Sequence, residues 1–494
     1  MKTNKVFKIA LFICIFLFFL FTQLIYQGAN LDNYWNFNNS LQISNGLLPY
    51  SDINIITTPL FHYIIAIFLL IIGKNIVVFA SITSLLKLIH LILLVKIYEL
   101  LSEKKNVTNK IFLYIIGTFL MYLTYYEYNL LASLFISFIV FIELKYKNSK
   151  NKHFYIGFIS SLALLTKQSV GLFVILLVLF KPIIFKEENK KSIIYRFIGF
   201  FIPLFVFILY LLITNTFNGF LNYCIFGLSS FNNRIKVIDY IFNSVSNYHY
   251  SFLLLLIIVI FTILHEIYLI IKKKQTNDKN AVLIFYSIAS FVCFYPISDY
   301  HHLLPIIFTL LPIIVTYIPK IKFIDILNNN RIINIAAFII AIYILLLPIY
   351  MYFNIESYDN KVILKENYNS LNGIVVEKQY KSYIDLLLDY ELEMGKNGID
   401  VIILNKGSVV IHLANNKYYK YFDLFMNGNF GKDGEKDIIK EIKSRENTVY
   451  LVNTNDIYLN EGKSFQLPNK IIEYVVNNLS YEEMIDEYRI YKIN

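Results

Sequence analysis

The sequence has little charge, little glycine and few cysteines. Only 16% of its 494 residues are charged, against about 25% in an average soluble domain, which excludes a soluble globular protein. The three cysteines, Cys14, Cys224 and Cys293, lie far apart without a Cys-x-x-Cys pair, so neither a disulfide framework nor a thiolate zinc site is expected. With 17 glycines and no glycine-rich phosphate loop, a nucleotide-driven transporter is also disfavoured.

Long apolar runs dominate what remains. Hydrophobic residues make up 57% of the chain and come in blocks of about 18 or more, the length that crosses roughly 30 Å of hydrocarbon. The fold class predicted is an α-helical polytopic membrane protein with about 11 transmembrane helices. The predicted spans are 9–26, 76–100, 111–126, 130–144, 154–165, 170–185, 194–213, 251–271, 281–295, 303–317 and 332–352.

Lysine clusters set the predicted sidedness of these spans. They occupy alternate connections, so all of them lie inside if the N-terminus is inside. The apolar stretch 59–73 is then an interfacial helix within an outer loop at 27–75, because counting it as a crossing would put the later clusters outside. An excess of lysine and arginine is the usual bias of inner loops in membrane proteins, so these clusters do not indicate binding to nucleic acid. Residues 1–352 are predicted to form the transmembrane domain.

The tail, 353–494, is predicted to be a small extracytoplasmic α/β domain. From Asn354 onward it holds 17 Lys or Arg and 22 Asp or Glu, although the whole chain carries a net charge of +10. Short β-branched runs at 400–405 and 448–452 indicate strands, and amphipathic stretches at 380–394 and 436–445 indicate helices. No catalytic constellation is recognisable in the tail, so a structural or acceptor-recognising role is expected.

The 13 acids of the first 353 residues divide by predicted side. Ionisable groups at membrane depth are expensive, so each needs water, a partner or a function. Eight acids, Glu143 and Glu266 among them, fall near inner lysines and are expected to be simply solvated. Five fall on the outer side and are the candidates for function: Asp32, Asp52, Glu127, Asp239 and Asp299.

Each outer candidate also has a plain structural interpretation. Asp32 could accept a proton from a hydroxyl beside Trp35, or it could cap a helix. Asp52 lies in a Gly/Pro turn that needs no chemistry, and Glu127 in a short turn that water could solvate. Lys167 could snorkel to the surface or bind a lipid phosphate. Within the second span, Lys87 and His90 share a face, and a buried partner is expected for Lys87.

The order of these parts resembles the C-type membrane glycosyltransferases, in particular glycosyltransferase family 39 with its protein O-mannosyltransferase and aminoarabinose transferase relatives. The resemblance covers most of residues 1–352. The matching motifs are the acid Asp32 after the first span, Gly46-x-x-Pro49-Tyr50-x-Asp52, Pro59-Leu60-x-x-Tyr63, the acid Glu127, Thr166-Lys167-Gln168 and His302-x-Leu304-Pro305.

The resemblance implies transfer of a sugar from a polyprenyl-phosphate donor to an acceptor on the outer face, with inversion. Asp32 would be the general base and Glu127 would position the sugar or acceptor or hold a cation. Lys167 and Gln168, with His301 or His302, would offset charge on the departing phosphate. Asp52 and Tyr50 belong to the substrate-binding motifs, Tyr300 stands where relatives often have an arginine, and Arg234 is a candidate substitute for it.

No metal ligands are predicted, although the resemblance leaves open a divalent cation such as Mg²⁺ or Mn²⁺. The partners expected are the lipid-linked donor, membrane lipid, and an acceptor that is a cell-envelope lipid, glycan or protein. Two other classes fit the same sequence: a transporter or flippase of lipid-linked glycans, and a glycan polymerase or ligase. A transporter more often shows an inverted repeat with charges near the midplane, and here the charges collect at one face.

Overall fold

The structure is a computed structural model in which the chain forms two compact units. The helical unit comprises Met1–Gln23, Thr83–Leu209 and Arg234–Tyr350, and the mixed unit comprises Leu24–Ile82, Tyr210–Asn233 and Met351–Asn494. The structure describes residues 5–27, 30–102, 107–147, 149, 151–185, 190–227, 249–273, 279–294, 298–317, 331–358, 360–455 and 467–493.

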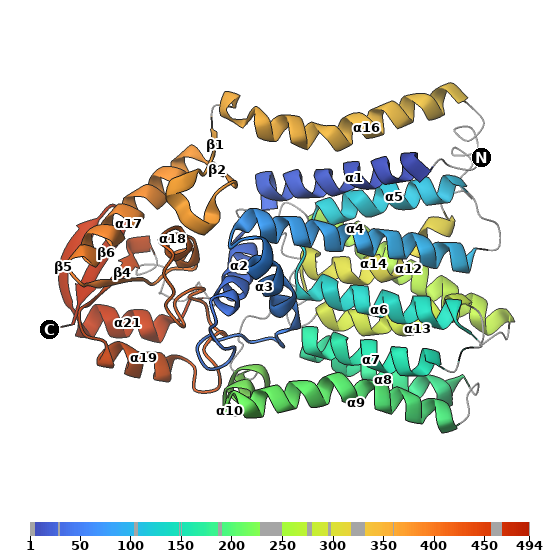
Figure 1. Cartoon of the computed structure of the whole chain (residues 1–494), viewed down its shortest axis with the longest axis horizontal. Helices are drawn as coiled ribbons and strands as arrows, with labels where there is room; N and C mark the ends of the chain where they lie inside the picture. Colours follow the sequence, from blue (N-terminus) through green and yellow to red (C-terminus); the bar gives the residue numbers. More distant parts are fainter. Residues whose placement is uncertain are drawn as a thin grey trace. The chain divides into compact units, whose positions relative to one another are not determined.

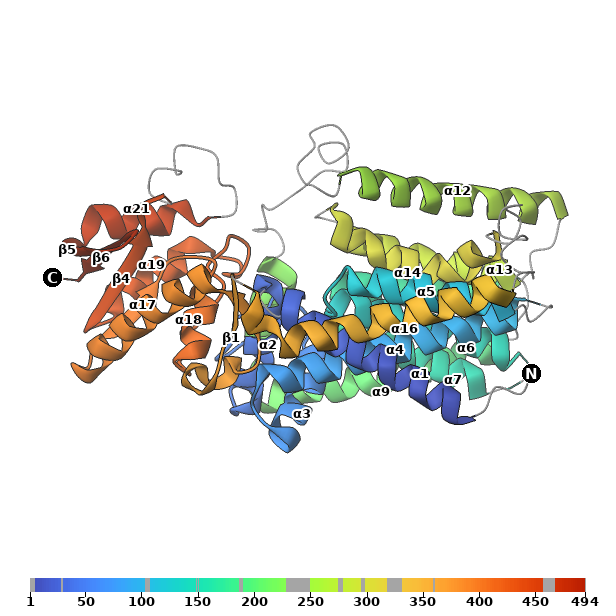
Figure 2. The same cartoon turned by 90° about the horizontal axis from the view of Figure 1, so that it is seen from above.

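The helical unit consists of long apolar helices that run side by side (Figures 1 and 2). A helix lies at every predicted span, since continuous apolar sequence leaves an internally hydrogen-bonded helix as the conformation that suits lipid. In chain order they are α1 (Lys5–Thr22) with η1 (Gln23–Gln27), α4 (Ile76–Leu101), α5 (Val107–Tyr122), α6 (Tyr128–Lys145), α7 (Asn151–Thr166), α8 (Gln168–Ile184), α9 (Lys190–Ile213), α12 (His249–Lys273), α13 (Lys279–Ser287) with η4 (Ile288–Phe294), α14 (Tyr300–Tyr317) and α16 (Arg331–Phe353).

By length and composition, six segments of the described residues are able to cross a membrane: Lys8–Tyr26, Ile76–Leu101, Tyr128–Lys145, Lys191–Ile213, Phe252–Lys272 and Tyr300–Tyr317. These make the chain a multi-pass membrane protein, and the full number of spans stays a prediction. Burial differs among them. The α14 span is 72% buried and the α12 span only 17% buried, so α14 lies in the middle of its unit while α12 lies at its edge.

The helix at the predicted interfacial segment is α3 (Leu60–Ile72). Its 13 residues extend about 20 Å, which is too short to cross about 30 Å of hydrocarbon. One face, with Phe61 and Ile65, is buried against α2 (Leu31–Ser44). At the far end, Leu70 and Ile71 are exposed. These features fit an interfacial helix, and its seat on a membrane remains a prediction.

The tail folds around a four-stranded sheet of order β3-β4-β6-β5. The predicted strands are confirmed as β3 (Asp400–Ile403) and β4 (Thr448–Asn453), which pair in parallel, and the predicted helices as α17 (Lys378–Lys396) and α19 (Glu435–Ser444). Elements that the sequence analysis did not predict are η6 (Ile355–Ser357), β1 (Lys361–Ile363), η7 (Glu366–Leu371), β2 (Val375–Glu377), α18 (Ser408–Ala414), α21 (Asn469–Asn478), β5 (Ser480–Ile485) and β6 (Tyr488–Lys492).

Alternation along the strands builds two apolar layers. Ile402 and Tyr450 share a core with Ile438 of α19 and Ile471 of α21, because successive strand residues point to opposite faces. On the other face, the hydroxyl groups of Tyr383 in α17 and Tyr488 in β6 are hydrogen-bonded at 2.6 Å. Figure 1 shows α17 on one side of the sheet and α19 with α21 on the other.

The predicted outer loop packs with the tail inside the mixed unit. The Asn54 amide donates to the Asn429 carbonyl at 2.9 Å, and the Lys432 backbone N–H donates to the Asn222 side chain at 2.8 Å. Asn222 belongs to η2 (Leu221–Phe226), which follows the short helix α10 (Phe217–Phe220). The sequence analysis treats 27–75 as part of the transmembrane domain, whereas the contacts group it with the tail.

Two acids expected to be solvated are in fact buried. Glu143, 5% exposed, lies 3.0 Å from the Arg196 guanidinium and 3.3 Å from the Lys181 ammonium, and it accepts a hydrogen bond from Tyr286. Glu266, 3% exposed, accepts a hydrogen bond from Tyr317. The expectation was wrong for Glu143 because its nearest cations lie on neighbouring helices. They pack around the carboxylate and take the place of water.

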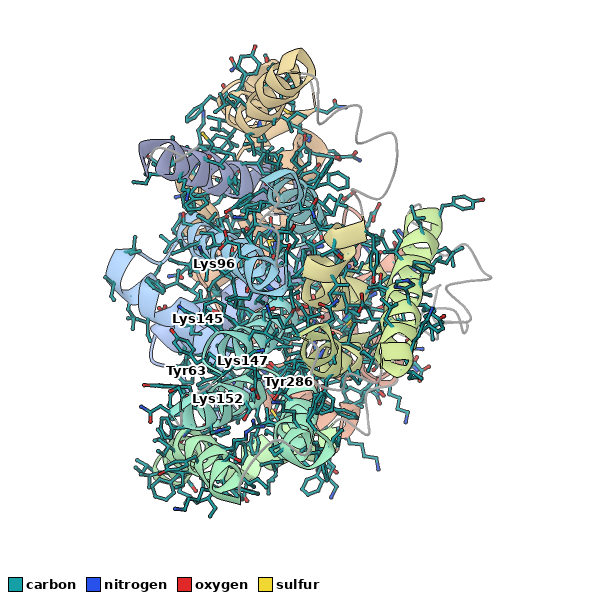
Figure 3. All side chains as sticks on the ribbon, turned by 90° about the vertical axis from the view of Figure 1, so that its right-hand side faces the viewer. Tyr63, Lys96, Lys145, Lys147, Lys152 and Tyr286 are labelled. Atoms are coloured by element: carbon teal, nitrogen blue, oxygen red, sulfur yellow. The ribbon has the colours of Figure 1, made fainter. Side chains whose placement is uncertain are left out.

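Glu143 lies two residues before Lys145, the last residue of α6. Figure 3 labels Lys145 together with Lys147, Lys152 and Tyr286. Lys152 of α7 also approaches the carboxylate, at 3.7 Å. One carboxylate therefore joins α6 to α7, α8, α9 and α13. A buried ion cluster of this kind fixes which helices meet, because removing one partner leaves the others as uncompensated charges.

We expect Glu143→Gln to destabilise the protein by about 3–5 kcal/mol, because it leaves buried cations without their carboxylate. The matched control is Glu99→Gln, whose partly exposed pairs with Lys96 and Lys110 should contribute about 0–1 kcal/mol. Melting of both variants in mild detergent measures the difference. Equal melting temperatures for the two variants would contradict a structural role for the Glu143 cluster.

Candidate functional site

Glu127 and Lys167 meet through a third side chain in the helical unit. Glu127 occupies the N-cap position of α6 with an extended backbone and is 8% exposed, and Lys167 occupies the N-cap position of α8. The amide of Asn129 donates to the Glu127 carboxylate, and the Lys167 ammonium donates to the amide oxygen of Asn129. The ammonium also lies 5.6 Å from the centre of the Tyr128 ring. Two turns 40 residues apart in sequence are thus joined.

The start of α14 brings the histidines to the same place. Asp299 accepts hydrogen bonds from the backbone N–H of His302, at 2.9 Å, and from its ring Nδ1, at 2.7 Å. The ring of His301 lies 5.4 Å from that of Tyr125. His302 is close enough to both Lys167 and Glu127 for their charges to act on it. Tyr300, the first residue of α14, is buried.

Asp299 has two roles at this position. As an N-cap, its carboxylate satisfies a backbone N–H at the start of α14, and it fixes the His302 ring with Nε2 facing away from the carboxylate. Burial alone would raise the pKa of the Asp299 carboxyl, but the charge and hydrogen bonds of His302 outweigh it and hold the pKa below its usual range. The carboxylate is therefore ionised at neutral pH and keeps His302 oriented.

Three helix N-termini converge in this cluster, those of α6, α8 and α14. Each contributes the equivalent of roughly +0.5 charge from unpaired backbone N–H groups. Added to the Lys167 ammonium and the His302 ring, these dipoles favour an anion, and Glu127 and Asp299 supply the opposing charge. We call Glu127, Asn129, Lys167, Asp299 and His302 the charged cluster.

Lys87 supports the turn that leads to Glu127. Its ammonium donates to the Thr124 carbonyl at 2.6 Å and lies 5.6 Å from the centre of the Phe19 ring, with the side chain fully buried. The buried partner expected from the sequence is therefore a backbone carbonyl. His90, one turn along α4, lies 3.4 Å from the Ser137 hydroxyl.

Asp32 lies in the mixed unit, in the first turn of α2, and its side chain is exposed. The capping interpretation of Asp32 is wrong, because Asn30 is the N-cap and accepts the Asp32 backbone N–H at 2.9 Å. An acid in the first turn is still favourable to the helix dipole. Trp35, which the sequence analysis places beside Asp32, is 4% exposed and packs edge-on against the His62 ring, with the ring centres 6.3 Å apart.

Asp52 and Tyr50 are held by their own turn. The Asp52 carboxylate accepts the Leu48 backbone N–H and the Ser51 hydroxyl, each at 2.8 Å. Tyr50 has a φ of 71°, is 2% exposed and donates its hydroxyl hydrogen to the Thr57 carbonyl at 3.0 Å. This is the plain turn interpretation weighed for Asp52.

Of the residues named from the sequence, the structure brings together Glu127, Lys167, His301 and His302, with Gln168 and Tyr300 at the same helix starts. Asp32, Asp52 and Tyr50 belong to the mixed unit. Arg234 lies outside the described residues.

Asn129 was missed by the sequence analysis. Asparagine is so frequent in this chain that a single one in an apolar helix carries little signal. Its position two residues after Glu127, at a buried helix start, is the feature that points to it. For metals, no group of three or more His, Cys, Asp or Glu side chains suited to an ion occurs among the described residues.

Comparisons with known proteins add one structural similarity. No family model matches the sequence, and no curated protein matches it. Among solved structures, the apo form of an oligosaccharyltransferase from Archaeoglobus fulgidus aligns with 94% of this chain and 71% of its own, at 11% identity and a TM-score of 0.49. At this TM-score and identity, the similarity establishes neither a common fold nor a common activity.

We expect Asp299→Ala to cost about 1 kcal/mol of stability through loss of the cap, and Asp299→Asn to cost much less because asparagine also caps. Because the pKa of Asp299 is lowered in the folded protein, the stability that its carboxylate contributes depends on pH. Its stabilisation is present above the unfolded pKa of about 3.9 and is lost as the pH falls through the folded value. Melting curves of the wild type and Asp299→Ala should therefore converge in acid. Equal losses for the Ala and Asn variants would contradict the capping role.

Proposed function

We propose that the protein is a membrane glycosyltransferase that moves a sugar from a polyprenyl-phosphate donor to an acceptor on the outer face, with inversion at the anomeric carbon. The observation that supports this most is the charged cluster, which combines an ammonium, an imidazole and three helix N-termini at one end of apolar helices. A phosphate on a lipid tail needs a positively charged site and an apolar surface next to it. Its charge needs cationic and N–H partners, and its chain needs hydrocarbon.

The reaction assigns a separate task to each group. As the acceptor oxygen bonds to the anomeric carbon, the bond from that carbon to the phosphate oxygen breaks and leaves polyprenyl phosphate. Lys167 and His302 offset the negative charge that grows on this phosphate, the kind of interaction that usually contributes most in such sites. Glu127, 8% exposed and fixed by Asn129, is suited to orient sugar hydroxyls.

Asp32 is the proposed general base that takes the proton from the acceptor hydroxyl. Its exposed carboxylate, at the start of a helix whose other polar residues are mostly buried, is accessible to an incoming acceptor. The acceptor is proposed to be a cell-envelope lipid, glycan or protein. A divalent cation, Mg²⁺ or Mn²⁺, could add to the positive charge that Lys167 supplies at the phosphate, with Glu127 as the residue proposed to hold it.

We expect Asp32→Asn to lower sugar transfer by about 100-fold or more, since an amide cannot act as a base. The matched control is Asp389→Asn, an exposed acid on α17 of the same unit, which should transfer normally. Mass spectrometry of lipids and glycans from cells carrying each variant measures transfer and identifies the acceptor. Near-normal transfer by Asp32→Asn would rule out Asp32 as the base. Release of polyprenyl diphosphate instead of monophosphate would indicate the polymerase or ligase class.

The proposed sidedness is testable with two exposed positions. We expect Ser51→Cys to react with a membrane-impermeant maleimide in intact cells, and Lys147→Cys, in the connection between α6 and α7, to react only after the cells are opened. The wild-type chain gives the background, which measures any reaction of the half-buried Cys14, while Cys224 and Cys293 are buried. The reverse pattern would place the predicted outer loop in the cytosol and contradict the proposed function.

A further inference from the structure

The Asn129 side chain is hydrogen-bonded to both charges of the Glu127–Lys167 pair. Asn129 is the second residue of α6 and only 2% exposed. Its NH₂ group donates to a Glu127 carboxylate oxygen, and its carbonyl oxygen accepts from the Lys167 ammonium. An amide is well suited to this position, since it carries donors and an acceptor in one plane.

A buried carboxylate and a partly buried ammonium that are separated by a single amide attract each other. This attraction grows as water is excluded, because the effective dielectric constant falls. Without the amide between them, Lys167 would pair directly with Glu127. Such a pair would neutralise both groups and withdraw the ammonium from any anionic ligand.

We propose that Asn129 is a positioning residue that holds Glu127 and Lys167 apart, so that the ammonium stays available to the phosphate of a lipid ligand. This proposal rests on the proposed function, and it adds a residue to which neither the sequence nor the comparisons assign a role. Asn129 takes up one of the three N–H groups of the ammonium. The proposal assigns the remaining N–H groups to phosphate oxygens.

The plain alternative is that Asn129 only satisfies polar groups at a buried helix start. That role would make every ligand bind less well when Asn129 is replaced, through loss of local order. A positioning role is more selective. It predicts loss of the preference for a phosphate-bearing lipid over the same lipid ending in a hydroxyl. The two lipids have identical polyprenyl chains, so this preference reports binding of the phosphate alone.

The experiment measures this preference with the full chain in mild detergent. Native mass spectrometry gives the affinities for polyprenyl monophosphate and for the matching polyprenol, and their ratio is the phosphate preference. We expect a high ratio for the wild type and a loss of about 10-fold or more in Asn129→Leu, comparable to Lys167→Met. Asn129→Gln, which keeps the amide, should recover part of the ratio. Asn109→Leu, a buried asparagine in α5, is the matched control and should behave as the wild type.

Asn129→Asp adds a pH readout and serves if the leucine variant fails to fold. An ionised aspartate pairs with Lys167 and repels Glu127, so the phosphate preference should be lost at pH 8. A protonated aspartate has a donor and an acceptor like the amide, so the preference should return in acid relative to the wild type at the same pH. Merely structural damage would not recover in this way.

Each outcome decides a different question. If Lys167→Met loses the phosphate preference while Asn129→Leu and Asn129→Asp keep it, the positioning role is overturned and the proposed function stands. If the wild type shows no phosphate preference, the phosphate role of Lys167 fails, and both proposals fail with it. A parallel loss for phosphate and alcohol lipids in Asn129→Leu would leave the plain structural role as the explanation.

Discussion

The cost of placing charge in an apolar surrounding is the constraint on which the arrangement of the helical unit depends. A buried charge without a partner costs several kcal/mol, so each buried ionisable group must find an opposite charge or a hydrogen bond. The helical unit satisfies this at both ends of α6. At one end Glu143 is paired with Arg196 and Lys181, and at the other Glu127 reaches Lys167 through Asn129. The first end is a closed ion cluster, and the second keeps its two charges apart.

This difference between the two ends of α6 distinguishes a structural ion cluster from a proposed ligand-binding site. Direct ion pairs stabilise helix packing but leave little capacity for a ligand, as at Glu143. Separated charges beside three helix N-termini keep that capacity, at some cost in stability. Sites that bind or react commonly hold groups in arrangements that packing alone would not favour. The contrast within one helix is therefore a stronger guide to the site than the presence of charged residues as such.

The sequence was sufficient where local pattern decides the outcome. Apolar run length predicted the positions of the helices, and short β-branched runs predicted β3 and β4, because both patterns depend on residues close together in the chain. The resemblance implied one site for Glu127 and Lys167, and the structure links the two side chains through Asn129. Solvation could not be predicted in the same way. Glu143 and Glu266 look like loop acids among lysines, and only the packing of neighbouring helices shows that they are buried.

The role of Asn129 could not be predicted from the sequence for a related reason, and neither could the packing of the outer loop with the tail. An amide has no distinctive pattern, and its role depends on two partners, one of them 38 residues away. Likewise, Asn38 of α2 donates to Asp423 of the tail at 3.3 Å, a contact between residues 385 positions apart.

That contact gives the tail a physical role in the mixed unit. Burial raises the pKa of the Asp423 carboxyl to about 6, while hydrogen bonds from the Leu424 backbone and Asn38 act in the opposite direction. The carboxylate thus depends on Asn38 for part of its stabilisation, and Asn38 lies less than two turns from Asp32 on the same helix. Because α18 also packs against α2, the tail holds the helix that carries the proposed base. A domain to which no catalytic residue is assigned can therefore still determine where the proposed base is presented.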